Sequence, residues 1–251
     1  MEKLTLLSAQ SHQQLHLKDG LDFDAFNHKQ TALLTVHELA AASSSFPLFL
    51  IKNTTTSQFE SVALMSLVNQ NVFFAQSTTV NVAYLPLSLQ LLPFSSMVNP
   101  EDANNMMVLI DENSSLLSTE TNNNTALFQA DGNPGQGIIA KQNAMAQFAQ
   151  QQLTTTEFIK QLVDADLLKE LTLEITFANG EKSTLKGLHT IKEEQLSQLS
   201  EEDKKRFETR GYYPAIFGML ASLTQMNRML QLHNQQSPEQ LISNMQFATE
   251  G

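Results

Sequence analysis

The stretch "LTLEITFANGEKSTLKGLHTI" (residues 171–191) indicates the local fold of this chain more clearly than any other. Apolar side chains alternate along its first half, at Leu171, Leu173, Ile175 and Phe177. This period of two is typical of a strand with one buried face. Asn179-Gly180 follows, a dipeptide that accepts the positive φ angles of a tight hairpin turn. The stretch therefore predicts an antiparallel β-hairpin near 171–189.

Short apolar and aromatic runs separated by polar turns lie upstream of this hairpin. They are "FPLFLIK" (46–52), "FESVALMSLV" (59–68), "VFFA" (72–75) and "MMVLI" (106–110). Such runs predict an antiparallel β meander over 46–110 in the N-terminal half. The most apolar stretch, "AYLPLSLQLLPF" (83–94), contains Pro86 and Pro93. Within it, Leu85, Leu89 and Leu92 have helical spacing, which favours a short buried helix with these three leucines facing the core.

Helical patterns concentrate after residue 138, so we expect an α+β fold. "TTTE" (154–157) matches a capping box and predicts that a new helix begins there. Thr190 and Ser200 are predicted to cap two further short helices, and Pro214 is predicted to begin a long one. In the tail, Ser237 is the expected cap of a short helix.

Composition excludes several classes of function. The net charge is −11, from 15 basic and 26 acidic residues, which disfavours nucleic acid and anionic membrane surfaces as partners. The chain has no cysteine, which excludes disulfides and thiolate metal sites and fits a reducing compartment. We find no signal peptide pattern and no apolar window of the roughly 18–20 residues that a membrane span needs. We therefore expect a cytoplasmic protein with no membrane span.

A spaced set of residues runs through "GLHTIKEEQLSQLSEEDKKRFETRGYYPAIFGMLASLTQMNRML" (187–230). Its members are Gly187, Ile191, Glu193, Leu199, Arg210, Gly211, Tyr212, Pro214 and Arg228. The set resembles the SapC family of bacterial proteins, and a looser likeness extends over about residues 31–232. The resemblance implies one SapC-like domain at 31–232, flanked by a polar N-terminal arm (1–30) and a C-terminal tail (233–251).

The resemblance also implies a setting, but no catalytic residues. The family is named for a locus linked to surface-layer (S-layer) protein export, and members are associated with outer-membrane receptors and flavin-dependent halogenases. One departure concerns two arginines that the family tends to carry after its Tyr-x-Pro segment. Tyr84 and Pro86 match that segment, but Leu91 and Leu92 stand near the place of the arginines. An anion-binding role for those arginines therefore does not transfer to this chain.

No residue pattern here completes a catalytic or metal site. His37-Glu38 begins like a zinc-protease motif, but Ala41 stands where the second histidine is required. His12 and His16 are four residues apart and lack an evident third ligand. The glycine-rich "DGNPGQG" (131–137) lacks the Gly-Lys-Ser/Thr ending of a phosphate loop. We therefore predict no catalytic residue, no metal and no cofactor, while an enzyme of unknown reaction, metal-dependent or not, remains the alternative.

The candidate binding residues are Tyr84, Arg210, Tyr212 and Tyr213. Arg and Tyr are favoured at interfaces, and three of these residues cluster at a junction between two predicted helices. The competing interpretation is a structural corner, because helix capping by itself explains Gly211 and Pro214. We expect a non-catalytic accessory protein that binds a peptide or protein in a bacterial surface-protein export or nutrient-uptake system. The oligomeric state is left open.

Overall fold

The computed structural model describes the chain except for residues 1–2, 69, 75–81, 100–101, 122–123 and 249–251. The chain divides into two compact units, which are described separately below. Unit 1 comprises Met1–Phe26 and Leu87–Gln150, and unit 2 comprises Asn27–Pro86 and Gln151–Gly251. The longest helix, α5 (Gln136–Asp164), contributes its first part to unit 1 and its second part to unit 2.

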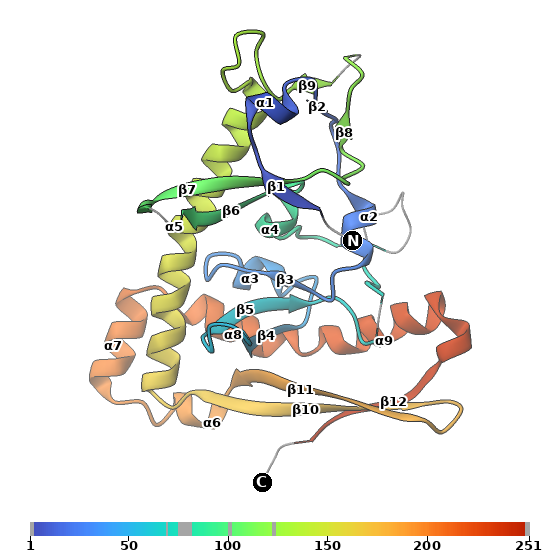
Figure 1. Cartoon of the computed structure of the whole chain (residues 1–251). Helices are drawn as coiled ribbons and strands as arrows, with labels where there is room; N and C mark the ends of the chain where they lie inside the picture. The colour runs from blue at the N-terminus through green and yellow to red at the C-terminus, as the bar shows by residue number, and fades with distance from the viewer. Residues whose placement is uncertain (1–2, 69, 75–81, 100–101, 122–123, 249–251) are drawn as a thin grey trace. The chain divides into compact units, whose positions relative to one another are not determined.

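Unit 1 contains two small antiparallel sheets (Figure 1). The first has the order β1-β7-β6, with β1 at Leu4–Leu6, β6 at Phe94–Asn99 and β7 at Asp102–Asp111. The second has the order β8-β2-β9, with β2 at His16–Leu17, β8 at Leu117–Ser118 and β9 at Thr125–Ala126. The short helices of unit 1 are α1 (Ala9–His12), α2 (Phe23–Asn27) and α4 (Leu87–Gln90).

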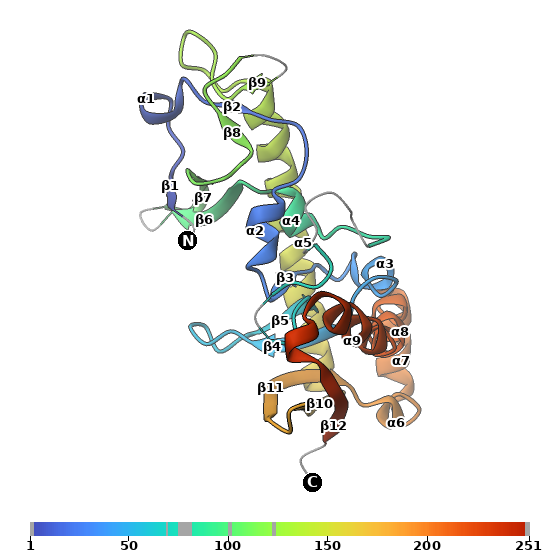
Figure 2. The ribbon, with the colours of Figure 1, turned by 90° about the vertical axis from the view of Figure 1, so that its right-hand side faces the viewer.

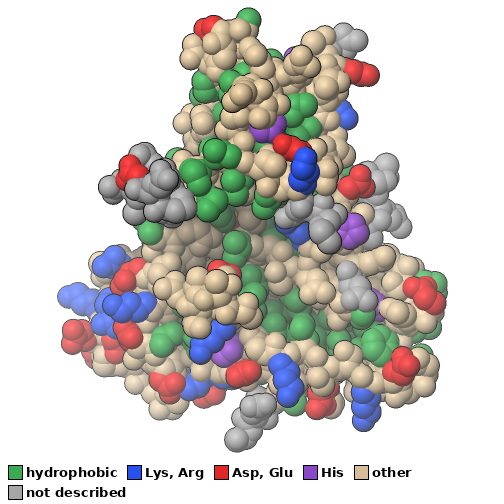
Figure 3. Space-filling model, viewed as in Figure 1, with side chains coloured by type: hydrophobic (Ala, Val, Ile, Leu, Met, Phe, Trp, Pro, Cys, Tyr) green, Lys and Arg blue, Asp and Glu red, His purple; other side chains and the backbone are tan. Residues whose placement is uncertain are grey.

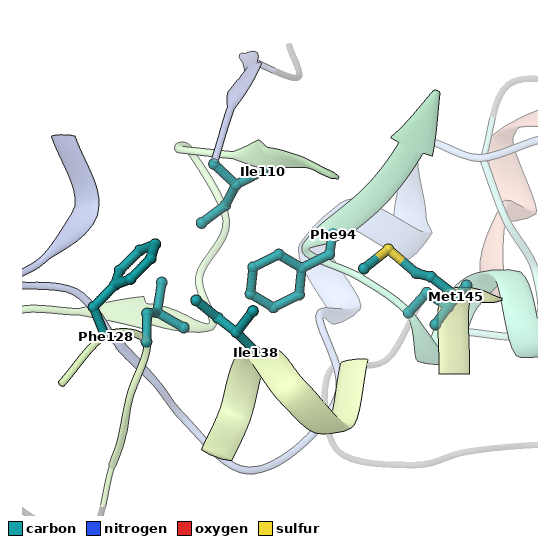
Figure 4. Packing of buried hydrophobic residues seen from close by; sticks show 7 residues of the cluster. Phe94, Ile110, Phe128, Ile138 and Met145 are labelled. Carbon is teal, nitrogen blue, oxygen red and sulfur yellow. The ribbon is translucent and has the colours of Figure 1, made fainter. Parts of the chain in front are cut away.

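The core of unit 1 lies between its first sheet and the first part of α5 (Figure 4). Phe94 and Ile110 come from the sheet, Ile138 and Met145 come from α5, and all are at most 3% exposed. Phe128 closes the cluster from the loop before α5. The apolar face of the sheet, where side chains alternate, therefore packs against the apolar face of α5, where they recur with the helical period.

Unit 2 is built on one six-stranded antiparallel sheet with the order β12-β10-β11-β4-β5-β3. The strands are β3 (Thr31–Leu33), β4 (Leu48–Lys52), β5 (Phe59–Leu64), β10 (Leu168–Phe177), β11 (Lys182–Ile191) and β12 (Ile242–Ala248). The helices are α3 (Leu39–Ala42), α6 (Glu193–Leu196), α7 (Glu201–Thr209), α8 (Tyr213–Ser222) and α9 (Gln225–Gln236), followed by the 3₁₀ helix η1 (Pro238–Gln240). Figure 2 shows α8 and α9 beside this sheet, where α8 contacts β4 and β11 and α9 contacts β12.

The α+β class, the antiparallel sheets and the 171–189 hairpin are confirmed. The hairpin turn differs in detail from the predicted tight turn. Its loop spans residues 178–181, and only Gly180 has a positive φ, of 87°. Phe177 donates its N–H to the Glu181 carbonyl at 2.9 Å across the loop. The single glycine is therefore the one position that needs the left-handed conformation.

The predicted strand "VFFA" is wrong over its described part. Val72, Phe73 and Phe74 are irregular in backbone, and residue 75 lies outside the described residues. The two phenylalanines are nevertheless fully buried, and the Phe73 ring packs edge-on against Phe46 with 4.8 Å between centroids. The aromatic run reflects burial in the core rather than strand pairing.

Helix starts and stops account for three further corrections. The "TTTE" box does not begin a helix, since α5 continues through it and the Thr155 and Thr156 hydroxyls donate to carbonyls four residues earlier, at 2.8 and 3.0 Å. The helix predicted from Pro214 is interrupted between α8 and α9. Ser200 caps α7 as predicted, but Thr190 lies in β11 and caps nothing. The tail holds η1 and then β12, a strand that the sequence did not predict.

The stretch 83–94 forms a shorter helix than predicted. Only α4 is helical, and Leu89 is buried whereas Leu85 and Leu92 are half-buried. Of the three leucines predicted to face the core, Leu89 is therefore buried as predicted, and Leu85 and Leu92 are only partly buried. Over the described part of the chain, no helix has both the length and the apolar character needed to cross a membrane.

Candidate functional site

The junction between α7 and α8 is a sharp corner held by backbone hydrogen bonds. Gly211 has a φ of 68° and donates its N–H to the Glu208 carbonyl at 3.0 Å. Tyr212 donates its N–H to the Phe207 carbonyl, also at 3.0 Å. This is the pattern by which a left-handed glycine ends a helix, and Pro214 then occupies the first turn of α8. The corner places Arg210, Tyr212 and Tyr213 together, as predicted from the sequence.

Tyr212 anchors this corner in the core. It is 3% exposed, and its ring packs edge-on against Phe158 and Phe207, with centroid distances of 5.0 and 6.0 Å. Burial raises the pKa of its phenol, with a smaller raising effect from Glu157 and an opposing effect from Arg210. The phenol therefore stays protonated at neutral pH, and any contact of Tyr212 with a partner stays a prediction.

Half-buried Tyr213 and exposed Phe217 form the aromatic pair on the outer side of the corner. Their rings stack, with centroids 5.9 Å apart and planes 20° apart. Phe217 is 56% exposed, an unusual state for a phenylalanine, and Arg210 at the end of α7 is exposed as well. We call Arg210, Tyr213 and Phe217 the corner surface. Sequence reasoning missed Phe217, although its position off the apolar stripe of α8 was a usable signal.

The corner surface continues into a hollow along α7. Glu202, Lys205, Arg206, Thr209 and Arg210 line this hollow, which has a volume of about 280 Å³. Arg206 forms an ion pair with Asp203 one turn earlier, so Lys205 and Arg210 are the exposed cations of this face. Figure 3 shows Lys and Arg side chains gathered over α7, with acidic side chains beside them. The face is suited to a partner that offers both a carboxylate and an apolar group.

Tyr84 belongs to a different contact network. Its hydroxyl donates to Glu38 Oε1 at 2.9 Å, and Glu38 Oε2 accepts the Thr35 backbone N–H at 2.8 Å. The Ser45 hydroxyl oxygen accepts the N–H groups of Ala83 and Tyr84, at 2.9 and 3.0 Å. Among the described residues, no hydrogen bond or ring contact joins Tyr84 to the corner surface.

The Tyr84–Glu38 hydrogen bond joins two segments of the chain and is poorly suited to acid–base catalysis. Glu38 is 3% exposed, and burial, followed by the Glu38 charge and hydrogen bond, raises the pKa of Tyr84 well above its usual value. A phenol with a raised pKa is a poorer base at neutral pH, because its anion is disfavoured. The pair ties residues 35–38 to the segment ahead of α4, and Glu38 is a partner that sequence reasoning missed.

The histidines considered as metal ligands lie in separate surroundings. His12 Nε2 is 3.2 Å from Glu112 Oε1, His16 Nδ1 is 3.2 Å from the Gln14 carbonyl, and His37 is exposed. Within the part of the chain that the structure describes, no group of three or more His, Asp or Glu side chains is arranged to hold a metal ion.

Comparisons with known proteins identify the family of this chain but no individual related protein. No curated protein and no solved structure matched the chain. A family model described as SapC matches residues 7–229, which begins further toward the N-terminus than the resemblance over about residues 31–232. Since this match spans most of the chain, the protein belongs to the SapC family.

Proposed function

We propose that this protein is a non-catalytic accessory protein that binds a peptide or protein partner through the corner surface. The observation that carries the proposal is the stacked Tyr213–Phe217 pair, with Phe217 56% exposed next to the exposed Arg210. A few residues contribute most of the binding energy at protein interfaces and are enriched in Tyr, Trp and Arg, and phenylalanine is also enriched at the centre of interfaces. The packing of the corner supports this role, because the buried Phe207 ring packs against both Tyr212 and Tyr213, and Tyr213 in turn stacks on Phe217.

The biological setting that we propose is bacterial surface-protein export or nutrient uptake, in the cytoplasm. This part rests on membership of the SapC family and on the sequence-based expectation about location. The chemistry of the surface narrows the partner further. Lys205 and Arg210 favour a carboxylate, and the aromatic pair favours an apolar side chain. We therefore expect a peptide segment in which an acidic residue lies close to an apolar one.

The experiment is a selection of random peptides from a display library on the immobilised chain, followed by affinity measurement on synthetic copies. The test variant is Phe217→Ser, and the matched control is Leu153→Ser, since Leu153 is a 65% exposed apolar residue on α5. We expect selected peptides to be enriched in adjacent acidic and apolar residues. Their Kd should weaken about tenfold or more in Phe217→Ser, the effect expected of an interface anchor, and stay unchanged in Leu153→Ser.

A melting temperature within about 2 °C of the parent for both variants would show that the fold is intact, since surface changes alter stability little. Peptides that bind parent, test and control variants equally would refute the corner surface as the binding site. A library that yields no enriched peptide on the parent chain would count against peptide binding itself.

A further inference from the structure

A second concave site lies in unit 2, at the end of α9. The hollow has a volume of about 200 Å³, and the turn from α9 into β12 supplies most of its lining through His233, Gln236, Ser237, Glu239 and Gln240. Val68, Gln70 and Val72 complete the lining. In Figure 1, this turn is the red segment beyond the end of α9 that leads into β12.

The turn that forms the hollow is held by its own hydrogen bonds. The Asn234 side chain makes two hydrogen bonds to the backbone of Ile242. Its Nδ2–H donates to the Ile242 carbonyl at 2.9 Å, and its Oδ1 accepts the Ile242 N–H at 2.8 Å. Gln236 donates Nε2–H to the Val72 carbonyl at 2.8 Å, which links the end of α9 to Val72. These bonds fix the lining residues before any ligand arrives, and preorganisation of this kind favours binding.

His233 presents a hydrogen-bond acceptor that the protein does not use. The side chain is 4% exposed, and its Nε2 lies 3.0 Å from the Gln240 carbonyl. A carbonyl oxygen only accepts, so Nε2 is the donor of this bond, and in the neutral form of the ring the lone pair lies on Nδ1. Among the residues that the structure describes, none pairs with Nδ1. His233 lines the hollow, and an imidazole nitrogen without a protein partner is free to accept a hydrogen bond from a donor that enters there.

The electrostatic character of the hollow is negative. The C-terminal end of a helix carries a partial negative charge, and α9 is 12 residues long with its last turn at the hollow. Glu239 adds a carboxylate at the exposed rim, and no Lys or Arg is among the lining residues. An anion is therefore disfavoured, whereas a cation that donates several hydrogen bonds would satisfy each of these groups.

We propose that this hollow binds a primary ammonium group, with His233 Nδ1 as one acceptor and the Glu239 carboxylate as the counter-charge. An ammonium group has three N–H donors and no acceptor, which matches the lining. The volume is below the roughly 300 Å³ at which pockets for drug-sized ligands begin. The ligand is therefore a small aliphatic amine or the end of a lysine side chain. The proposal is independent of the corner surface.

The test is an NMR titration of the full chain, labelled with ¹⁵N, using n-butylammonium, a blocked lysine (Nα-acetyl-lysine N-methylamide) and n-butanol as the neutral control. We expect saturable binding of an ammonium probe in the millimolar range, a shift of the His233 Nδ1 resonance, and no binding of n-butanol. Saturation by both ammonium probes would assign the shared ammonium chemistry. Saturation by n-butylammonium alone would point to a free amine, and saturation by blocked lysine alone to a lysine of a peptide.

The variant Glu239→Gln should raise the Kd of the ammonium probe by about 1.5- to 5-fold, the effect expected for a solvent-exposed ion pair. Glu208→Gln is the matched control, because Glu208 is an exposed acid on α7, and it should leave the Kd unchanged. Equal binding of n-butanol, an unmoved His233 Nδ1 resonance, or equal effects of the two variants would overturn the proposal. The last result would show only general attraction of cations to an acidic chain.

Discussion

Replacing Tyr84 by Phe removes one hydroxyl and leaves the ring in place. That hydroxyl donates to Glu38 Oε1 at 2.9 Å, and Glu38 is 3% exposed. Hydrogen bonds to a charged group contribute about 1.5–3 kcal/mol, more than bonds between neutral groups. The expected loss in the free energy of unfolding lies near the lower end, about 1.5 kcal/mol, for two reasons. Glu38 keeps its bond from the Thr35 N–H, and Tyr84 is only half-buried, so water replaces part of the lost bond.

Urea denaturation at pH 7 measures this loss, with Tyr213→Phe as the matched control. Tyr213 is also half-buried, but among the described residues its hydroxyl has no hydrogen-bond partner. The control should therefore stay within about 0.5 kcal/mol of the parent. A loss of about 1.5 kcal/mol in Tyr84→Phe with a neutral control would show that the Tyr84–Glu38 bond stabilises the fold, which the sequence alone did not indicate.

The same bond predicts a pH dependence with a definite sign. The pKa of folded Tyr84 lies above its ordinary value of 10.0, first because of burial and then because of Glu38. Below pH 10 the phenol is protonated in both folded and unfolded chains, so its full contribution is present. As the pH rises above 10, the unfolded chain loses the proton first, and this contribution is lost. The stability difference between the parent and Tyr84→Phe should therefore narrow above pH 10. A difference below about 0.5 kcal/mol at pH 7, or one that does not narrow, would refute the reasoning.

Two further predictions concern packing and acid stability. Gly218→Ala should lower the free energy of unfolding by about 1–3 kcal/mol, because the new Cβ would lie 3.0 Å from Ala40 Cα and 3.1 Å from the Leu39 carbonyl oxygen. Calorimetry would detect this loss, and a melting temperature equal to that of the parent would contradict the close packing of α3 on α8. Lys3, followed by Thr5 and His12, lowers the pKa of Glu112 to about 2, so its contribution is present above pH 4.5 and is lost as the pH falls toward 2. Glu112→Gln should accordingly lose less stability than the parent between pH 4.5 and 2, and equal losses on acid titration would disprove this.

Local signals explain what the sequence predicted correctly. The β10–β11 hairpin needs only an alternating apolar face and a turn glycine, and both lie within its own residues. Ser200 likewise caps α7 through Asp203, three residues away, accepting its N–H at 3.0 Å. Arg210 and Tyr213 could be placed at a corner because Gly211 and Pro214 mark the end of one helix and the start of the next.

Distant partners explain the failures. The Thr155 hydroxyl in the "TTTE" box accepts the Val36 N–H at 2.8 Å, from a residue 119 positions earlier, while it also donates back to Gln151. A threonine engaged in this way supports a continuing helix instead of starting a new one. Nothing near residue 155 identifies Val36 as its partner. The capping box was therefore a valid local pattern that a tertiary contact overrides.

The same difference between local signals and distant partners applies to the candidate sites. Phe217 was open to prediction, because an aromatic residue off the apolar stripe of a helix must either meet another element or remain exposed. The His233 hollow was not, since its walls come from segments around residues 68–72 and 233–240, and neither contains a recognisable ligand motif. What makes His233 informative is the direction of one hydrogen bond, from Nε2 to the Gln240 carbonyl. That bond decides which ring nitrogen is left as an acceptor, and sequence patterns carry no information about it.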